Sequence, residues 1–400
     1  MQIEWTEGGT PRSARWRAEG GAAPPKRVLC VDDTLTADAA HRLASEGTGL
    51  LWRGDYQNAR QLLQALARRI DRPPRSASRK ARDRSAREAQ AEVAPPAQTF
   101  HLHRQAQAQR ARTLGRVLIE LGGDYGIALR RAPDLRPAIA EAWGPADGAA
   151  TTVVSLRELL GLVGAHEWRK KGVEIPALGS PPANRIHPHY GVFSPVRGEY
   201  IDLVAQAPLP AALTAALQTQ PLAFDIGTGT GVLAAVLARR GVPRIVATDQ
   251  DPRALACAAD NLARLAVADR VELLQADLFP PGRAALVVCN PPWLPGRASS
   301  PIEHAIYDED SRMTRGFLAG LPAHLAKGGE GWLILSDLAE HLGLRAPGEL
   351  QGWIAAAGLA VLQRHDIRPR HGKATDADDP LHAARAREVT SLWRLGAAAV

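Results

Sequence analysis

Short apolar runs alternate with amphipathic stretches along most of the chain, and this pattern predicts strands that alternate with helices. Near the N-terminus the runs "KRVLCVDD" (26–33) and "GLLWRG" (49–54) are typical of buried strands. Each is followed by a stretch with helical spacing, at 36–47 and 55–71. Residues 1–25 are rich in Gly, Pro, Arg and Ala and show neither pattern, so we expect a loose lead-in there.

The next part of the chain interrupts this alternation. Residues 72–98 have Pro pairs at both ends, no apolar periodicity and a strong basic bias. They predict a flexible insert, either a solvated charged loop or an arm that contacts nucleic acid. The stretch 100–123 has the pattern of one helix. We therefore predict a smaller N-terminal α/β domain at 26–150 and a second domain at 151–400.

A glycine-rich turn in the second domain is the clearest chemical signal. In "PLAFDIGTGTGVLAAVLARRG" (221–241) an apolar strand ends at Asp225, and a helix follows the glycines. Alternating glycines allow a tight turn and let a ligand approach the backbone, which indicates a nucleotide-type cofactor. An acid before the turn suits the cationic ammonium and sulfonium of S-adenosylmethionine better than a pyrophosphate. The turn consists of Gly227, Thr228, Gly229, Thr230 and Gly231.

A second acid follows the next predicted strand. Asp249 comes 24 residues after Asp225, at the end of "PRIVATD". An acid at this place can accept hydrogen bonds from both ribose hydroxyls of a nucleoside. Asp251 competes for the role, although its position before Pro252 also fits a helix N-cap.

A third acid ends the third strand. In "DRVELLQADLF", Asp277 is placed to accept a hydrogen bond from an adenine amino group, and Leu278 and Phe279 would form an apolar wall beside the base. Acids at the ends of three successive strands make coincidence a poor explanation.

The fourth strand ends in a polar motif. "AALVVCNPPW" (284–293) places Asn290, Pro291, Pro292 and Trp293 after an apolar run. The Asn290 side-chain oxygen and the Pro291 carbonyl can accept hydrogen bonds from a planar NH₂ group and direct its lone pair toward a methyl donor. The prolines fix φ, and Trp293 offers a flat face on which a planar group can stack.

With these motifs the chain resembles the class I S-adenosylmethionine-dependent methyltransferases, in the Asn-Pro-Pro-aromatic (small-domain, HemK-like) group. The resemblance covers about residues 185–400. It implies a Rossmann-like, mostly parallel seven-stranded sheet whose last strand is antiparallel, with S-adenosylmethionine as cofactor. It also implies that the segment around Phe193, Ser194 and Arg197 lies over the methionine part of the cofactor, with Arg197 near its carboxylate. Many members have Tyr or Phe where this chain has Trp293.

The net charge indicates which class of partner the protein binds, and the cysteine content indicates the compartment in which it works. The chain has a formal net charge of +7 and a pI near 9.6, which favours an anionic partner, with nucleic acid first. Cys30, Cys257 and Cys289 are far apart, so we expect neither a disulfide framework nor a metal site. No apolar stretch reaches the roughly 18 residues that a membrane span needs, and residues 1–20 lack the apolar core of a signal peptide. We expect a cytoplasmic protein that does not bind membranes.

These observations lead to three hypotheses about function. The first is a methyltransferase for a planar exocyclic nitrogen of an RNA base, adenine N6 or guanine N2 in ribosomal or transfer RNA, with the N-terminal domain presenting the substrate. The second is a protein glutamine N5-methyltransferase for a translation factor resembling a release factor. The third is a silent cofactor- or RNA-binding adaptor, against which the intact motif at 290–293 argues. The sequence leaves the oligomeric state open.

Overall fold

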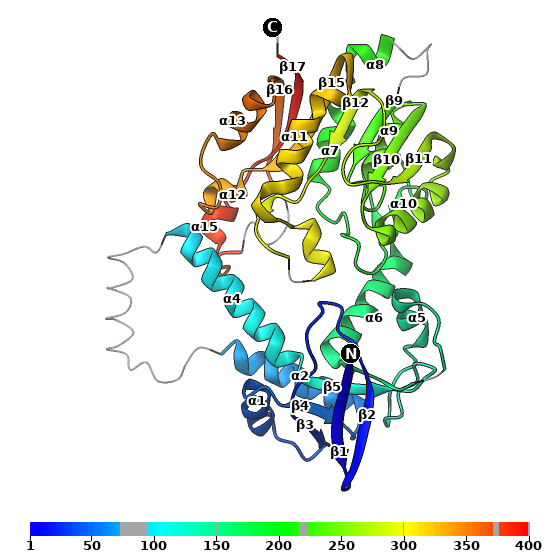
Figure 1. Ribbon diagram of the computed structural model, residues 1–400, viewed down its shortest axis with the longest axis vertical. Helices are drawn as coiled ribbons and strands as arrows, with labels where there is room; N and C mark the ends of the chain where they lie inside the picture. The colour runs from blue at the N-terminus through cyan, green and yellow to red at the C-terminus, as the bar shows by residue number, and fades with distance from the viewer. Residues whose placement is uncertain (73–94, 149, 216–221, 299, 371–375, 399–400) are drawn as a thin grey trace. The chain divides into compact units, whose positions relative to one another are not determined.

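The computed structural model in Figure 1 describes residues 1–72, 95–148, 150–215, 222–298, 300–370 and 376–398. The chain divides into two compact units, Met1–Glu167 and Trp168–Val400. The predicted division lay before residue 151. The division in the structure lies after Glu167, because residues 152–155 form a strand of the first sheet. The helix that follows that strand contains the division.

The first unit is built on a six-stranded sheet with the order β1-β2-β6-β5-β4-β3. Strands β3, β4 and β5 are parallel to one another, as the strand-helix alternation predicts. The elements of the unit are β1 (Gln2–Glu7), β2 (Thr10–Trp16), β3 (Val28–Val31), α1 (Ala37–Ser45), β4 (Gly49–Trp52), α2 (Tyr56–Ile70), α4 (Pro96–Leu114), β5 (Val117–Leu121), α5 (Arg136–Trp143), β6 (Thr152–Ser155) and α6 (Leu156–Lys171).

Two predictions for this unit are wrong, and a third concerns residues that lie mostly outside the described ones. Residues 1–25 are not a loose lead-in, because β1 and β2 form an antiparallel hairpin. Its alternate residues Ile3, Trp5, Ala14 and Trp16 are buried against the rest of the sheet. The stretch 100–123 is not one helix either.

The helix in this stretch ends at Leu114, and the apolar run "VLIEL" forms β5. Of the predicted insert 72–98, residues 73–94 lie outside the described residues, and 96–98 begin α4.

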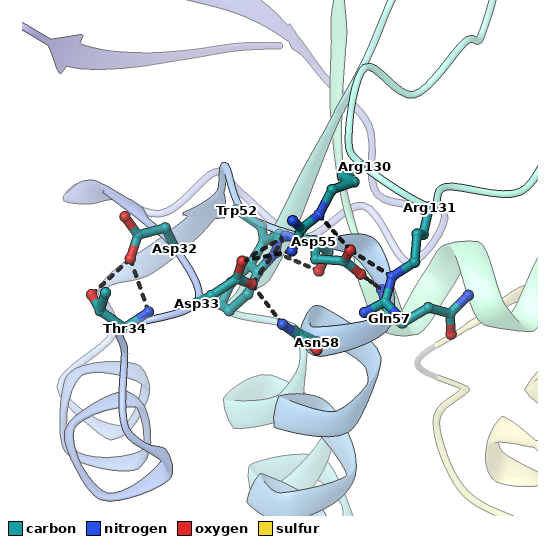
Figure 2. A network of polar contacts seen from close by, with 9 residues as sticks. All are labelled: Asp32, Asp33, Thr34, Trp52, Asp55, Gln57, Asn58, Arg130 and Arg131. Carbon is teal, nitrogen blue, oxygen red and sulfur yellow. Dashed lines mark hydrogen bonds and ion pairs between the residues drawn. The ribbon is translucent and has the colours of Figure 1, made fainter.

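Polar residues gather where β3 and β4 end (Figure 2). Asp55 is buried and caps α2 by accepting a hydrogen bond from the Gln57 N–H. Its other oxygen accepts from Arg130 Nε at 2.9 Å and from Arg131 Nε at 2.6 Å. The bond from Arg131 lowers the pKa of Asp55. Arg131 has φ of +56°, a conformation that bulky residues rarely adopt. This network fastens the loop after β5 to the start of α2.

The second unit contains a seven-stranded sheet with the order β11-β10-β9-β12-β15-β17-β16. Only β17 among these seven runs antiparallel to its neighbours, so the predicted Rossmann-like sheet is confirmed. The main elements are α7 (Glu199–Gln206), β9 (Leu222–Ile226), α9 (Val232–Arg239), β10 (Arg244–Asp249), α10 (Pro252–Arg264), β11 (Val271–Gln275), β12 (Ala284–Cys289), α11 (Arg312–His324), β15 (Leu325–Ser336), α12 (Leu338–His341), α13 (Glu349–Ala356), β16 (Leu359–Ile367), α15 (His382–Arg385) and β17 (Thr390–Ala397). Short elements are β7 (Val173–Glu174), β8 (Arg185–Ile186), α8 (Ala211–Ala215), β13 (Leu294–Pro295) and β14 (Tyr307–Asp308).

Both faces of this sheet are buried. Successive residues of a strand point to opposite faces, so Ala223 packs with α7, α9 and α10, whereas Phe224 packs with α11 and α13. Near-continuous apolar runs are the signature of such doubly covered parallel strands. No helix among the described residues is long and apolar enough to cross a membrane.

The turn after the central strand β9 is held by a buried carboxylate. Asp225 is 1% exposed, and its Oδ2 accepts hydrogen bonds from Thr228 Oγ1 at 2.6 Å and from the Ala234 N–H at 3.1 Å. Burial raises the pKa of Asp225 to about 6. The turn itself needs glycine at position 231, where φ is +79° and an added Cβ would lie 3.1 Å from the Cβ of Ala258 on α10. Strand β9 therefore delivers the backbone of the turn to the edge of the sheet in one fixed shape.

A glycine on α11 allows the first testable prediction. A Cβ on Gly320 would lie 2.5 Å from the ring of Phe279, which is stacked on His324 at 4.2 Å between centroids and cannot easily retreat. We expect Gly320→Ala to lower the free energy of unfolding by about 1–3 kcal/mol. The matched control is Gly352→Ala on α13, where nothing lies within 4 Å of the added Cβ. It should raise the free energy of unfolding by about 0.5–1 kcal/mol. Urea titration of both variants checks the pair, and equal effects would contradict the packing of Phe279 on α11.

The buried carboxylate gives a second prediction. Because the pKa of Asp225 in the folded protein, about 6, exceeds its ordinary value of 3.8, its stabilising contribution is complete below pH 3.8 and is lost as the pH rises through 6. Asp225→Asn cannot ionise and keeps one oxygen to accept both hydrogen bonds. Relative to the parent it should gain up to about 3 kcal/mol in free energy of unfolding between about pH 4 and pH 7. Urea titrations across that range measure the gain, and a difference independent of pH would disprove it.

Candidate functional site

The structure brings four predicted residues to one edge of the second sheet. Asp277, Asp249, Asp225 and Asn290 lie at or just after the carboxyl ends of β11, β10, β9 and β12. These strands are adjacent in that order and parallel, so their carboxyl ends meet at the same edge. In open α/β sheets this edge is where ligands bind. The four residues differ, however, in what surrounds them.

Asp249 is tied to the glycine turn. Its Oδ2 accepts a hydrogen bond from the Gly229 N–H at 3.0 Å, and its Oδ1 accepts from the Asp251 N–H at 3.0 Å. Burial raises the pKa of Asp249. Asp251 accepts from the Arg253 N–H and caps α10, so the helix-cap interpretation of this competitor holds.

The turn fits a cationic nucleoside. An added Cβ at Gly229 would meet no atom within 4 Å, so the backbone faces open space there. Thr228 and Thr230 are buried, and the Thr228 hydroxyl donates to Asp225. Asp225 and Asp249 place two carboxylates beneath the turn. A glycine surface with acids behind it suits the sulfonium and ammonium of S-adenosylmethionine. At Gly227 the space is filled, because an added Cβ would lie 2.5 Å from the Met313 methyl group.

The third predicted acid already has a partner. Asp277 forms a two-bond ion pair with Arg312 of α11, at 3.1 and 3.2 Å, and both side chains are 60% exposed. Leu278 has φ of +76°, and its carbonyl accepts a hydrogen bond from Thr248 Oγ1. Phe279 is stacked against α11, so its ring is engaged in packing. A role for these three residues beside an adenine stays a prediction.

Residues 189–197, upstream of β9, contact α10 at one end and approach Glu388 at the other. At one end, His189 Nε2 lies 2.9 Å from Asp260 Oδ2, and the His189 N–H donates to Cys257 Sγ, both on α10. At the other end, burial lowers the pKa of Arg197, and the negative charge of Glu388 partly offsets this lowering. Glu388 lies just before β17, whose first residue pairs with the last residue of β15. The segment therefore has one end at α10 and the other near Glu388, which precedes β17.

Three of the predicted cofactor residues lie within residues 189–197. Phe193 is half-buried. Ser194 Oγ is buried and has no hydrogen-bond partner among the described residues, which leaves a polar atom for a ligand to satisfy. Arg197 has the charges of Glu388, Arg385 and Glu199 around it. Its expected contact with the cofactor carboxylate stays a prediction.

The Asn-Pro-Pro-Trp motif has an internal hydrogen bond. Trp293 Nε1 donates to Asn290 Oδ1 at 2.9 Å. The indole also contacts Tyr200 of α7 edge to face, with 6.4 Å between centroids and an interplanar angle of 89°. Tyr200 is buried and its pKa is raised by burial. The motif is therefore braced against α7.

Several residues of the site were missed by sequence reasoning. Tyr200, Met313 and Arg312 approach the edge from α7 and α11, and no local pattern links them to the strand ends. The role of Asp308 was also missed: it accepts hydrogen bonds from the Met313 and Thr314 N–H groups and holds the start of α11. A short polar residue a few positions before a helix is the signal that could have revealed this cap.

Comparison with known proteins places this edge in a family. The family described as "Methyltransferase small domain" matches residues 183–344. A release factor glutamine methyltransferase from Cereibacter sphaeroides is 34% identical over 188 residues, which are 42% of this chain and 65% of that protein. A tRNA1(Val) (adenine(37)-N6)-methyltransferase from Bacteroides thetaiotaomicron is 32% identical over 127 residues, 30% of this chain and 54% of that protein.

Among solved structures, the ribosomal protein L11 methylase from Lactobacillus delbrueckii subsp. bulgaricus aligns with a TM-score of 0.35 and 16% identity over 55% of this chain and 90% of that one. The chain spans less than two thirds of the length of the two curated relatives. The family match covers the part of the chain that carries the glycine turn, the strand-end acids and the Asn-Pro-Pro-Trp motif. Residues 183–344 of this chain thus resemble the class I S-adenosylmethionine-dependent methyltransferases of the small-domain group.

Proposed function

We propose that this protein transfers a methyl group from S-adenosylmethionine to a planar exocyclic nitrogen. The observation that supports this most directly is the position of Asn290 at the end of β12, beside the glycine turn that ends β9. A cofactor on that turn would have its reactive end near the motif. S-adenosylmethionine supplies an electrophilic methyl group, which the nitrogen lone pair takes as the carbon–sulfur bond breaks, and the nitrogen then loses a proton to water.

The residues of the motif act on the substrate nitrogen. Such a nitrogen is a weak nucleophile because its lone pair is delocalised into the ring or the carbonyl. The Asn290 side-chain oxygen and the Pro291 carbonyl accept hydrogen bonds from its two N–H groups, which favours a pyramidal nitrogen with a localised lone pair. We propose that Phe193 and Ser194 exclude water from the cofactor. No general base is needed, because the methylated nitrogen is acidic enough to release its proton to solvent.

The acceptor that we favour is an RNA base, adenine N6 or guanine N2. The chain is basic overall, and an exposed aromatic residue stands beside basic ones at the start of the second unit. Trp168 is 49% exposed, and Lys171 Nζ lies 5.7 Å from its ring centroid. Lys170 shares this last turn of α6, as does Arg169, which is ion-paired with Asp260 at 2.8 Å. An exposed indole next to cationic groups suits stacking on an unpaired base with phosphate contacts around it.

A glutamine side chain in a translation factor is the second candidate acceptor. It is favoured by the 34% identity to a release factor glutamine methyltransferase over 188 residues. A glutamine amide offers the same planar NH₂ group, so Asn290 and Pro291 could hold it in the same way. In either case we propose that the N-terminal unit presents the substrate. The activity then belongs in the cytoplasm, where RNA and translation factors are found.

The first test of this function is Asn290→Ala. Without the side-chain acceptor only the Pro291 carbonyl holds the nitrogen, so we expect kcat to fall by about 10²–10³. Binding of S-adenosylmethionine, measured by calorimetry, should change little. Transfer is followed with tritiated methyl donor offered to ribosomes, transfer RNA and release factors in separate reactions. Label confined to release factor would favour the second acceptor, and equal transfer by variant and parent would remove the proposed mechanism.

The second test concerns RNA directly. Trp168→Ala should weaken binding of single-stranded RNA by about tenfold or more, the usual cost of losing one base–aromatic stack. Lys171→Ala should lower the slope of log affinity against log salt by about 1. The control is Leu362→Ala on β16, another exposed apolar side chain, at 55% exposure. Fluorescence anisotropy at several salt concentrations measures all three, and an unchanged affinity of Trp168→Ala would speak against RNA contact at this helix end.

A further inference from the structure

The indole of Trp293 is held by the protein at its edge. Its Nε1–H donates to Asn290 Oδ1, and the ring contacts Tyr200 edge to face. The side chain is half-buried and packs against the apolar clusters on both faces of the sheet. These contacts fix the position and orientation of the indole ring without any substrate. Stacking on a substrate, the role expected from the sequence, does not account for the hydrogen bond.

The hydrogen bond bears on the side chain that holds the substrate nitrogen. The Asn290 amide has an acceptor end and a donor end of nearly equal shape, and only the oxygen can accept from the substrate. If the amide turned over, its NH₂ group would point at the indole N–H, and two donors would face each other. The indole therefore selects the orientation in which the oxygen is available.

The oxygen can serve both partners. A carbonyl oxygen has two lone pairs, so Oδ1 can accept from the indole and from one substrate N–H. The two residues between them are prolines, whose fixed φ angles limit the movement of one side chain relative to the other. We propose that Trp293 is a positioning residue, which fixes the Asn290 amide with its oxygen toward the substrate nitrogen.

This role depends on the chemistry of tryptophan. Phenylalanine has no donor, and the tyrosine hydroxyl lies at the far end of its ring, away from the site of the indole N–H. Where relatives have Tyr or Phe, the asparagine must be oriented by other means. The inference rests on the proposed function, since the orientation matters only if Asn290 holds a substrate.

The kinetic test is a double-mutant cycle between Trp293→Phe and Asn290→Asp. Phenylalanine keeps a flat ring for stacking and removes the donor. A carboxylate has two equivalent oxygens, so it presents an acceptor whichever way it turns. Trp293→Phe should lower kcat by roughly tenfold when residue 290 is Asn, as one lost hydrogen bond implies, with KM for S-adenosylmethionine unchanged. In the Asn290→Asp background the same change should alter kcat less than about twofold.

The assay uses whichever of ribosomes, transfer RNA or release factor accepts the label. The control is Trp353→Phe, a half-buried indole on α13 that packs beside Arg345, and it should leave kcat unchanged. Equal losses from Trp293→Phe in both backgrounds would indicate a packing or stacking role, and no loss in either would also overturn the inference.

A second measurement does not depend on turnover. In a spectrum of protein labelled with ¹⁵N-tryptophan, the indole signal of Trp293 is identified by its loss in Trp293→Phe. It should be shifted downfield and exchange slowly with solvent, and Asn290→Ala should move it upfield and speed its exchange. A signal unaffected by Asn290→Ala would overturn the inference even if transfer is observed. A signal that responds, in a protein whose transfer is unaffected by Asn290→Ala, would refute the proposed function and leave the hydrogen bond intact.

Discussion

One buried carboxylate organises the second unit. Asp225 ends the central strand β9, between β10 and β12, and its Oδ2 holds both the Thr228 hydroxyl and the Ala234 N–H. The glycine turn is thereby pinned at both ends, and Asp249 from the next strand holds the Gly229 N–H between them. The raised pKa of Asp225, about 6, measures the cost of keeping this charge out of water. A site for a cation can repay such a cost, because a bound positive charge favours the ionised carboxylates.

The carboxyl edges of the two sheets differ in how their charges are balanced. In the first unit the strand ends carry carboxylates that arginines already neutralise. Arg53 binds Glu7 and Glu120, and two further arginines bind Asp55. In the second unit Asp225 and Asp249 receive hydrogen bonds from neutral donors, namely backbone N–H groups and one hydroxyl. In the first unit, arginines therefore neutralise Glu7, Glu120 and Asp55. In the second unit, the charges of Asp225 and Asp249 are left for a cationic ligand.

The sequence predicted best what depends on neighbours along the chain. The four strands that end near Asp225, Asp249, Asp277 and Asn290 were found because each apolar run and its polar end lie within a few residues of each other. The hairpin at 2–16 was missed because each of its strands shows only two buried apolar residues at a spacing of two, too short an alternation to stand out among Gly, Pro and Arg. The helix predicted at 100–123 failed because "VLIEL" suits either a helix end or a buried strand, and pairing with β4 and β6 decides between them. The partners that engage Asp277 and Phe279 come from α11, and such contacts depend on the three-dimensional fold.

The fourth strand end shows how a short motif and the fold act together. Asn290 and Trp293 are close in sequence, so their hydrogen bond can form within the motif itself. The position of the pair, however, depends on Tyr200 and on apolar clusters from both faces of the sheet. An amide at the mouth of a strand would ordinarily turn freely between its two ends. The indole of Trp293 restrains this amide and packs against the apolar clusters on both faces of the sheet. The packed core therefore fixes the position of Asn290 Oδ1, the atom on which the proposed chemistry depends.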